Sequence, residues 1–297
     1  MKEIPTFLIN KIKKQYPNEL DDILSGYKEN RITTLRINKL KSSKGEIINI
    51  LNENNIKYEN VSWYDDALII NDDINRIKEL LIYEEGKIYL QSLSSMIPPL
   101  IVDPKEQEMI LDMAAAPGGK TTEMQAIANN KAMITAIEKN KIRSDRLKYN
   151  IEKQGAKKIN VLNIDARRID EYFKFDKILL DAPCSGSGTL NINDKSFNSF
   201  TEELVTRSVN IQKELITEAI KHLNINGELI YSTCSILKEE NEDIINYILN
   251  SNSNIELIPI NTIPNIPVLE NTIPGTITVC PTEYYEGFYV AKLKRIS

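Results

Sequence analysis

The spacing of apolar and polar positions changes near residue 109. From there to the end of the chain, short apolar runs alternate with longer charged segments of helical spacing. Five of the apolar runs have the length of strands: MILDMA, AMITAIE, KINVLNID, FDKILLD and GELIYSTCS. The last segment, TITVCPTEYYEGFYVAKLKR, predicts two further strands joined by a polar turn. This alternation predicts an α/β fold with a mostly parallel, seven-stranded sheet and helices on both faces.

The pattern before residue 101 predicts a smaller α/β unit. Short helices are expected from Pro5 and from Pro17, because proline suits the first turn of a helix. Strands are expected at TTLRIN, ALII and GKIYLQ, with the helical segments EIINILNENN and INRIKELLIY between them. The stretch IVDPKEQE is polar and contains a proline, which predicts a boundary. We therefore expect two domains, residues 1–100 and residues 101–297.

Composition narrows the classes of protein that fit. The formal net charge is −5 and the pI is about 5.3, which argues against a protein that holds nucleic acid by bulk charge. The first part of the chain is nevertheless locally basic and includes Arg36 of TTLRIN, so it is either solvated surface or a phosphate-contacting surface. The sequence has no apolar run of membrane-spanning length and no secretion signal, and we expect a cytoplasmic protein that does not contact membranes.

Residues Met109 to Thr122, MILDMAAAPGGKTT, predict a strand, a tight turn of small residues and a helix. Small residues let the backbone approach a ligand, and the helix start offers free N–H groups. The turn does not match the GxGxxG of a dinucleotide site. Its GKT matches the end of a P-loop, but Ala114 stands where a P-loop has glycine, so an ATPase remains an alternative.

Acidic residues follow the next two strands. Glu138 comes about twenty residues after the turn, where an acid often binds the two hydroxyls of a ribose. Asp165 ends the following strand and is placed to accept a hydrogen bond from an adenine amino group. Either acid alone is as well explained as a helix cap. Together, beside a turn that contains proline, they favour a nucleoside without phosphates, such as S-adenosylmethionine.

Two of the three cysteines lie at the predicted ligand edge of the sheet. Cys184 follows the fourth strand in DAPCSGSG, and Cys234 ends the fifth in YSTCS. If these strands are neighbours, both sulfurs face one cleft; a disulfide is the alternative, which a reducing compartment disfavours. Cys280 lies in an ordinary strand pattern and His222 on a long helix, and both are expected to be structural. The cysteines form no CxxC pair and His222 is the only histidine, so we expect no metal site.

Three long motifs, LDMAAAPGGKT, DAPCSGSGTL and YSTCSILKEENE, closely resemble the Sun (nucleolar-protein/Sun) family of RNA cytosine-5 methyltransferases. The segments TTLRIN, IYLQSLSSM and PTEYYEGFYVAKL match more variable motifs of that family, so the resemblance covers nearly the whole chain. It implies a Rossmann-like class I S-adenosylmethionine-dependent methyltransferase domain. It also implies that the small N-terminal α/β domain is RRM-like and binds RNA.

The resemblance also implies roles for individual residues. Cys234 would be the nucleophile that adds to the target cytosine, and Cys184 would assist release of the enzyme from the methylated base. Asp181 would lie between cofactor and cytosine, with Lys120 close to it, so these four residues are the expected catalytic set. The residues expected to hold S-adenosylmethionine are Ala114, Ala115, Ala116, Pro117, Gly118, Gly119, Lys120, Glu138, Arg143, Asp165 and Asp181.

The sequence therefore predicts an RNA 5-methylcytosine methyltransferase that acts on structured RNA, with ribosomal RNA favoured over transfer RNA. The alternative from another class is a non-catalytic RNA-binding factor in ribosome assembly, which would need neither thiol. We expect a monomer whose RNA selection rests on the first hundred residues and the edges of the catalytic cleft. One departure from the family is Thr282 after Pro281, where relatives often carry histidine; the pattern assigns this position no role.

Overall fold

Residues 33–90 form a four-stranded antiparallel sheet in this computed structural model, which describes residues 4–194, 197 and 199–297. The strand order is β2-β3-β1-β4, and the chain runs β, α, β, β, α, β, which is the ferredoxin-like arrangement shared by RRM domains. The prediction of a small RRM-like α/β unit is thereby confirmed. Its elements are β1 (Thr33–Ile37), α3 (Lys44–Glu53), β2 (Tyr58–Asn60), β3 (Ala67–Ile70), α4 (Ile74–Lys78), α5 (Leu81–Glu84) and β4 (Ile88–Leu90).

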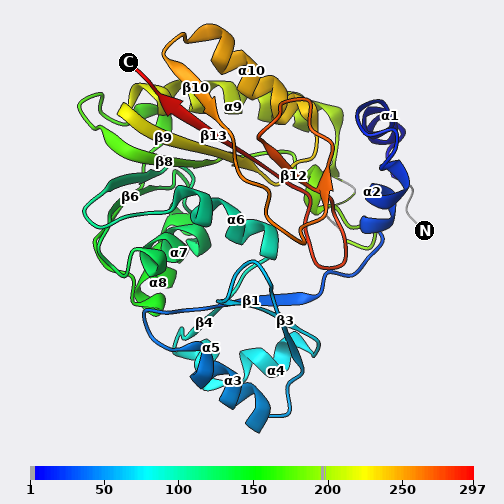
Figure 1. Ribbon diagram of the computed structural model, residues 1–297, viewed down its shortest axis with the longest axis vertical. Helices are drawn as coiled ribbons and strands as arrows, with labels where there is room; N and C mark the ends of the chain where they lie inside the picture. The colour runs from blue at the N-terminus through cyan, green and yellow to red at the C-terminus, as the bar shows by residue number, and fades with distance from the viewer. Residues whose placement is uncertain (1–3, 195–196, 198) are drawn as a thin grey trace.

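The larger sheet has nine strands in the described residues, in the order β11-β12-β13-β9-β8-β5-β6-β7, with β10 paired to β13 (Figure 1). The neighbours from β9 through β8, β5 and β6 to β7 pair in parallel, and β13 pairs antiparallel to β9. The strands are β5 (Met109–Asp112), β6 (Met133–Ile137), β7 (Ile159–Leu162), β8 (Phe175–Asp181), β9 (Leu223–Thr233), β10 (Ile255–Ile258), β11 (Val268–Leu269), β12 (Ile277–Val279) and β13 (Phe288–Arg295). The predicted mostly parallel sheet is confirmed, but two of its strands were not predicted: β11, whose two residues are too few to show a period, and β10, a four-residue strand that pairs with β13.

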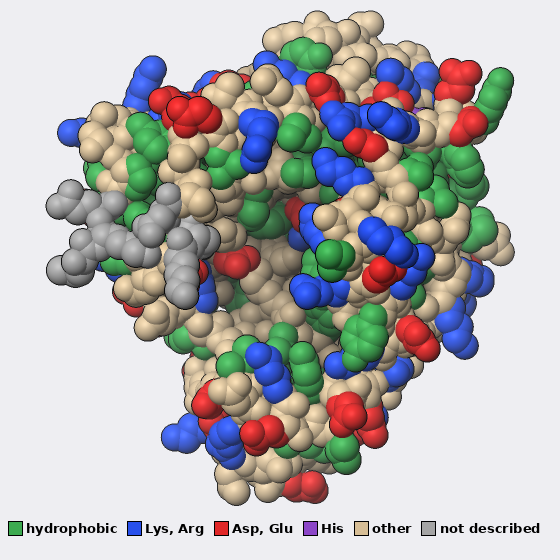
Figure 2. All heavy atoms as spheres, turned by 180° about the vertical axis from the view of Figure 1, so that it is seen from behind, with side chains coloured by type: hydrophobic (Ala, Val, Ile, Leu, Met, Phe, Trp, Pro, Cys, Tyr) green, Lys and Arg blue, Asp and Glu red, His purple; other side chains and the backbone are tan. Residues whose placement is uncertain are grey.

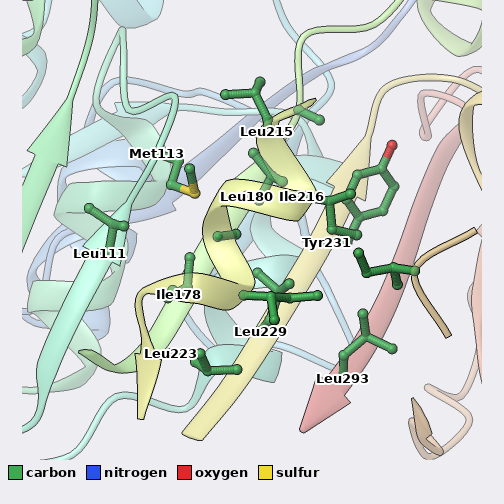
Figure 3. Packing of buried hydrophobic residues seen from close by; sticks show 14 of the residues in the cluster. Leu111, Met113, Ile178, Leu180, Leu215, Ile216, Leu223, Leu229, Tyr231 and Leu293 are labelled. Carbon is green, nitrogen blue, oxygen red and sulfur yellow. The ribbon is translucent and has the colours of Figure 1, made fainter. Parts of the chain in front are cut away.

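Helices cover both faces of this sheet, as expected for alternating strands and helices. On one face, Leu215 and Ile216 pack on Leu180 and Leu229 of the central strands (Figure 3). Each such fully buried side chain stabilises the fold by roughly 1.5–3 kcal/mol. The helices of the chain are α1 (Thr6–Gln15), α2 (Leu20–Gly26), α6 (Leu93–Val102), α7 (Gly119–Ile127), α8 (Lys141–Gln154), α9 (Glu202–Lys221) and α10 (Glu242–Ser251), with α9 and α10 on this face and α6, α7 and α8 on the other.

Helix α6 connects the two sheets and was not predicted, because it contains Pro98 and Pro99. Proline lacks the N–H that would bond to the carbonyl four residues earlier. The Gln91 Nε2 donates instead to the carbonyl of Ser95, the acceptor that Pro99 leaves free, at 3.2 Å. The apolar residues of α6 are buried against the larger sheet, so this helix holds the two sheets together.

Helices α1 and α2 pack with residues from the other end of the chain. Ile12 and Ile23 are buried with Ile236, Leu237 and Cys280 rather than with the small sheet. The expected structural role of Cys280 as a buried core residue is confirmed. The division of the chain at residue 100 stays a prediction, and the segment before β1 contributes to the core beside the larger sheet.

Arg36 of β1 is completely buried, so both interpretations of the basic segment, solvated surface and phosphate-contacting surface, are wrong for this arginine. Its Nε donates to Gln91 Oε1 at 3.1 Å, and its Nη2 donates to Thr122 Oγ1 at 3.2 Å. The Glu123 carboxylate of α7 lies 3.8 Å away and is also fully buried. Arg36 therefore joins the small sheet to the helix that follows the small-residue turn.

The buried Glu123 predicts a pH dependence of stability. Burial raises the pKa of this carboxyl from 4.5 to about 8, although the charge of Arg36 and the hydrogen bond from Gln91 oppose the rise. Between these values the folded chain binds more protons than the unfolded chain, so stability falls as the pH rises through this window. From pH 6 to pH 9, the melting temperature should fall by roughly 5 °C more in the wild type than in Glu123→Gln. Equal slopes in thermal melts of the two proteins would contradict this assignment.

Candidate functional site

The turn from Ala114 to Gly118 leaves β5 at its carboxyl end and enters α7. Gly118 has φ +107°, a conformation that favours glycine, and a Cβ there would lie 2.9 Å from a methyl carbon of Leu147. Two side chains of α8 hold the turn. The Arg143 Nη2 donates to the carbonyl of Ala116 and the Asn150 Nδ2 donates to that of Pro117, each at 2.8 Å. The small residues therefore expose backbone to the space beyond the sheet edge.

Glu138 and Asp165 lie beside this turn and line a narrow apolar cavity together with Ala114. Glu138 is buried, and its carboxylate accepts the Asn140 N–H at 2.8 Å and lies 3.5 Å from Arg143 Nη1. Asp165 also caps the short helix η1 (Ala166–Arg168), as its alternative interpretation expects. Hydrogen bonds from the Arg167 side chain lower the pKa of Asp165 to about 2, so this carboxylate is charged at neutral pH.

These residues fit a bound adenosine. The buried Glu138 carboxylate in the wall of this slot suits hydroxyl donors, and the charged Asp165 in the same wall is a second acceptor. A Cβ at Gly119 would lie 3.0 Å from the Tyr89 ring, so the glycine keeps the adjacent cavity open. Ala114 lines both this slot and a larger cavity of about 450 Å³, so the two cavities adjoin at the turn.

The larger cavity opens between the small sheet and the carboxyl ends of β5, β8 and β9. Figure 2 shows this face hollowed above the part that carries the small sheet, with Lys and Arg side chains gathered along one rim. Its lining residues are Tyr89, Leu90, Gln91, Ser92, Ser95, Asp112, Ala114, Ala115, Ala116, Pro117, Gly119, Lys120, Asp181, Thr189, Cys234, Glu286 and Phe288. Of the four expected catalytic residues, three line this cavity: Lys120, Asp181 and Cys234.

Cys184 and Cys234 are free thiols whose sulfurs lie 2.8 Å apart. They follow β8 and β9, which pair in parallel, so the expectation that neighbouring strands bring both sulfurs together is confirmed. The hydrogen bond to Cys234 and burial raise the pKa of the Cys184 thiol well above 9.0. Cys184 therefore keeps its proton at neutral pH, and its thiol lies within hydrogen-bond distance of Cys234, the member of the pair that lines the cavity.

Lys120 and Asp181 form an ion pair of 2.7 Å at the same cavity. Burial lowers the pKa of Lys120, but the charge and hydrogen bond of Asp181 outweigh burial and raise it above 10.5. A negative charge on Cys234, which lines the same cavity, also raises the pKa of Lys120. The second oxygen of Asp181 accepts the Ser232 hydroxyl at 2.8 Å, which fixes the carboxylate on its strand.

Sequence reasoning gave no role to several residues of the cavity wall. Glu286 lines the cavity, and its carboxylate accepts the Ser92 hydroxyl at 2.7 Å. Phe288 lies under Lys120, with the ammonium 5.4 Å from the ring centre. Both lie in PTEYYEGFYVAKL, and Ser92 lies in IYLQSLSSM, so the variable motifs were the only signal that these positions share a site.

His222 lies away from this site, as expected. It is buried at the end of α9, where its ring contacts the Phe173 carbonyl and Glu218. Within the described ranges, no three His, Cys, Asp or Glu side chains are grouped as metal ligands. Over the same ranges, every helix is too short or too polar to cross a bilayer.

Comparison with known proteins gives matches over both parts of the chain. A family model described as 16S rRNA methyltransferase RsmB/F matches residues 99–294, and one described as the ferredoxin-like domain of RsmF/B-like methyltransferases matches residues 4–75. The chain is 32% identical to ribosomal RNA small subunit methyltransferase F of Shewanella piezotolerans, over 97% of this chain and 63% of that protein. It therefore spans less than two thirds of that relative.

Two further similarities extend the range of relatives. The chain is 32% identical to the 28S rRNA (cytosine-C(5))-methyltransferase of Mus musculus, over 98% of this chain and 39% of that protein. A methyltransferase homolog from Pyrococcus horikoshii superposes with a TM-score of 0.83 at 28% identity, covering 98% of this chain and 99% of that one. The resemblance inferred from the motifs is thereby confirmed by sequence and by fold.

Proposed function

Because this chain belongs to the RsmB/F family of 16S rRNA methyltransferases, we propose that it is an S-adenosylmethionine-dependent RNA cytosine-5 methyltransferase, with a cytosine of structured ribosomal RNA as its substrate. One observation carries the proposal. A free thiol, Cys234, lines the cavity together with the Lys120–Asp181 ion pair, and the Cys184 thiol lies 2.8 Å from its sulfur. Relatives named for ribosomal RNA favour that substrate over transfer RNA.

The methyl donor is S-adenosylmethionine, which supplies an electrophilic methyl group on a sulfonium. The turn from Ala114 to Gly119 would lie along it, Glu138 would bind the ribose hydroxyls, and Asp165 would face the adenine. Arg143 would act by holding Ala116 and Glu138 in place, since its guanidinium contacts both. Lys120 and Asp181 would lie where the methyl group meets the target base, because both line the larger cavity.

The thiol at position 234 makes the chemistry possible. Carbon 5 of cytosine is a poor nucleophile. When the Cys234 thiolate adds to carbon 6, the electrons of the 5,6 double bond move to carbon 5. Carbon 5 would then take the methyl group as the sulfonium–methyl bond breaks, with that electron pair staying on the sulfur of the departing thioether. Loss of the carbon-5 proton to solvent returns the C–H electron pair to the 5,6 bond, and the carbon–sulfur bond breaks with its electrons going to Cys234. The target base must be single-stranded or flipped out to reach the cavity.

The neighbours of Cys234 act on its charge. Lys120, paired with Asp181, places a positive charge near the thiolate before addition and again when it leaves. Cys184 would donate its proton in a hydrogen bond to the departing sulfur, which lowers the barrier to release. Asp181 would contact the ring nitrogen or amino group of the cytosine and favour the adduct.

One face of α8 extends from the cavity and is suited to RNA. Arg143, Arg146 and Asn150 share that face because they are spaced by three and four residues. Asn150 touches the turn, and the charge of Arg146 reaches Tyr89 of the cavity wall. Arg146 has no acidic partner among the described residues, and Tyr149 beside it is 60% exposed. An unpaired cation beside an exposed aromatic ring fits a phosphate and a stacked base.

Arg146→Ala is expected to weaken RNA binding about 3- to 10-fold and to lower the salt dependence of binding by about one phosphate contact. Affinity for S-adenosylmethionine should stay unchanged, because Arg143, Asn150 and Asn140, rather than Arg146, contact the turn and the Glu138 carboxylate in the described part of the chain. Lys174→Ala removes a cation at the opposite edge of the sheet, where its ammonium bonds to the Lys221 carbonyl, and serves as the control. Filter binding over a salt series decides: equal affinity of wild type and Arg146→Ala would remove α8 from the RNA surface.

The proposed function is tested by methyl transfer from labelled S-adenosylmethionine to RNA, with nucleoside analysis of the product. We expect 5-methylcytidine in small-subunit ribosomal RNA, and bisulfite sequencing should locate it. If label appeared in transfer RNA alone, transfer RNA would be the substrate instead of ribosomal RNA. Binding of cofactor and RNA without methyl transfer would favour an assembly factor. Stabilisation by ATP rather than S-adenosylmethionine would favour the ATPase alternative. The chain is further proposed to act as a monomer in the cytoplasm, where thiols stay reduced.

A further inference from the structure

A buried carboxylate joins the two cysteine loops and has no part in the mechanism above. Glu240 ends the short helix η4 (Lys238–Glu240), and its side chain is completely shielded from solvent. It lies between the loop that carries Cys184 and the loop that carries Cys234. A charge in this position requires hydrogen bonds from its surroundings, because burial penalises the ionised form.

The hydrogen bonds of Glu240 come from the residue that follows each cysteine. One oxygen accepts the Ser185 N–H at 2.7 Å, and the other accepts the Ser185 hydroxyl and the Ser235 hydroxyl at 2.6 Å each. Gln212 of α9 adds a longer bond of 3.3 Å to the first oxygen. Every one of these partners donates, which suits a carboxylate. Among the described residues, no cation lies within ion-pair distance of it.

The second serine is itself fixed from several sides. The Ser235 hydroxyl lies 2.8 Å from that of Ser187 and accepts the Leu237 N–H at 3.0 Å. The Tyr231 hydroxyl donates to the backbone carbonyl of Glu240 at 2.6 Å, which fixes the carboxylate relative to β9. The network therefore connects both loops to one point.

We propose that Glu240 is a positioning residue for the reaction: by holding Ser185 and Ser235, it sets the separation and direction of the Cys184 and Cys234 thiols. The inference rests on the proposed function, since it concerns the same thiol pair. Glu240 touches neither substrate nor cofactor. It acts through the two serines, and it keeps the Cys184 S–H directed at Cys234 when that sulfur leaves the base.

The charge of Glu240 also acts on Cys184. Four other titratable groups of the described residues face this thiol pair: Lys120 and Asp181 at the cavity, Tyr231 of β9, and Glu240. The Cys234 hydrogen bond contributes most to the raised pKa of Cys184, and the negative charge of Glu240 contributes in the same direction. Removing that charge should allow Cys184 to ionise at lower pH, and an ionised Cys184 cannot donate to the departing thiolate.

Glu240→Gln tests this, because the amide keeps the shape of the side chain but replaces one acceptor oxygen with a donor and removes the charge. We expect turnover to fall about 10-fold, with a covalent protein–RNA adduct accumulating and the KM for S-adenosylmethionine unchanged. Alkylation of Cys184, followed by peptide mapping against pH, should begin at lower pH than in the wild type. Loss of folded protein alone would change neither the fraction of active enzyme trapped as adduct nor the pH at which alkylation of Cys184 begins.

The neighbouring Glu239→Gln is the matched control, because Glu239 is partly exposed and pairs only with Lys11 among the described residues. It should behave as the wild type. Wild-type turnover, no adduct and an unchanged alkylation profile in Glu240→Gln would overturn the proposal.

If Glu240→Gln does not fold, Ser185→Ala decides instead. It removes one hydroxyl bond and leaves the backbone bond, so it should show a smaller change in the same direction. A Ser185→Ala protein that releases product as fast as the wild type would overturn the proposal. Failure of the proposed function looks different, because the wild type itself would then form neither product nor adduct.

Discussion

Cys234→Ala is expected to abolish methyl transfer to RNA, lowering the rate by more than about a thousandfold. Without the sulfur, nothing in the cavity adds to carbon 6, and carbon 5 stays too weak a nucleophile to take the methyl group. Cys184 cannot substitute for it, because its pKa is raised well above 9.0 and it does not line the cavity among the described residues. Transfer of labelled methyl groups to RNA, measured in a single turnover, gives the rate directly.

Two controls separate this result from general damage. Cys234→Ala should still bind S-adenosylmethionine and RNA, because the turn and the α8 face are unchanged. Cys280→Ala removes the third thiol, which is buried in the core beside α1 and α2, and should leave the rate of transfer near that of the wild type. Transfer by Cys234→Ala at the wild-type rate would show that the reaction does not use this thiol.

Cys184→Ala should have the second-largest effect, and of a different kind. Addition and methyl transfer proceed through Cys234, but the departing sulfur loses the S–H that lies 2.8 Å from it. Release therefore slows, and we expect a protein–RNA adduct that survives denaturation and accumulates to about one per active site. Denaturing gel electrophoresis with labelled RNA measures this fraction.

The double variant Cys184→Ala/Cys234→Ala isolates the origin of the adduct. It should form none, because the nucleophile is absent. A Cys184→Ala protein that turns over at the wild-type rate without adduct would show that Cys184 has no part in release. An adduct that persists in the double variant would place the covalent bond on another residue.

Much of the fold could be predicted because the larger sheet is built from parallel strands with strong apolar runs. Strands β8 and β9 are two such runs, and each ends in a turn rich in small polar residues. Because the two strands are neighbours, the sequence predicted that Cys184 and Cys234 lie close together. The turn before α7 was also visible in the sequence, because glycine and alanine positions show where backbone lies close to a ligand. Local pattern carries this information directly.

Other parts depend on partners that are distant in the sequence. Arg36 has the pattern of a strand residue with one exposed face, but Gln91 and Glu123 bury it, and no local signal shows this. The cavity wall includes Ser92, which caps α6, and its partner Glu286. Helix α6 was not predicted because its two prolines do not fit a helical pattern. Asp165 was predicted to face adenine, but its hydrogen bond from the Arg167 side chain was not predicted, because that bond depends on the geometry of a single turn of 3-10 helix.

RNA in which 5-fluorocytosine replaces the target cytosine tests directly whether Cys234 is the nucleophile. The fluorine cannot leave as a proton does, so a methylated base stays bound to the thiol that attacked it. The wild-type chain with S-adenosylmethionine should form a stable complex, and peptide mapping should place the RNA on Cys234. Mapping to Cys184, or methylated RNA without any trapped complex, would show that Cys234 does not attack the cytosine from the cavity wall.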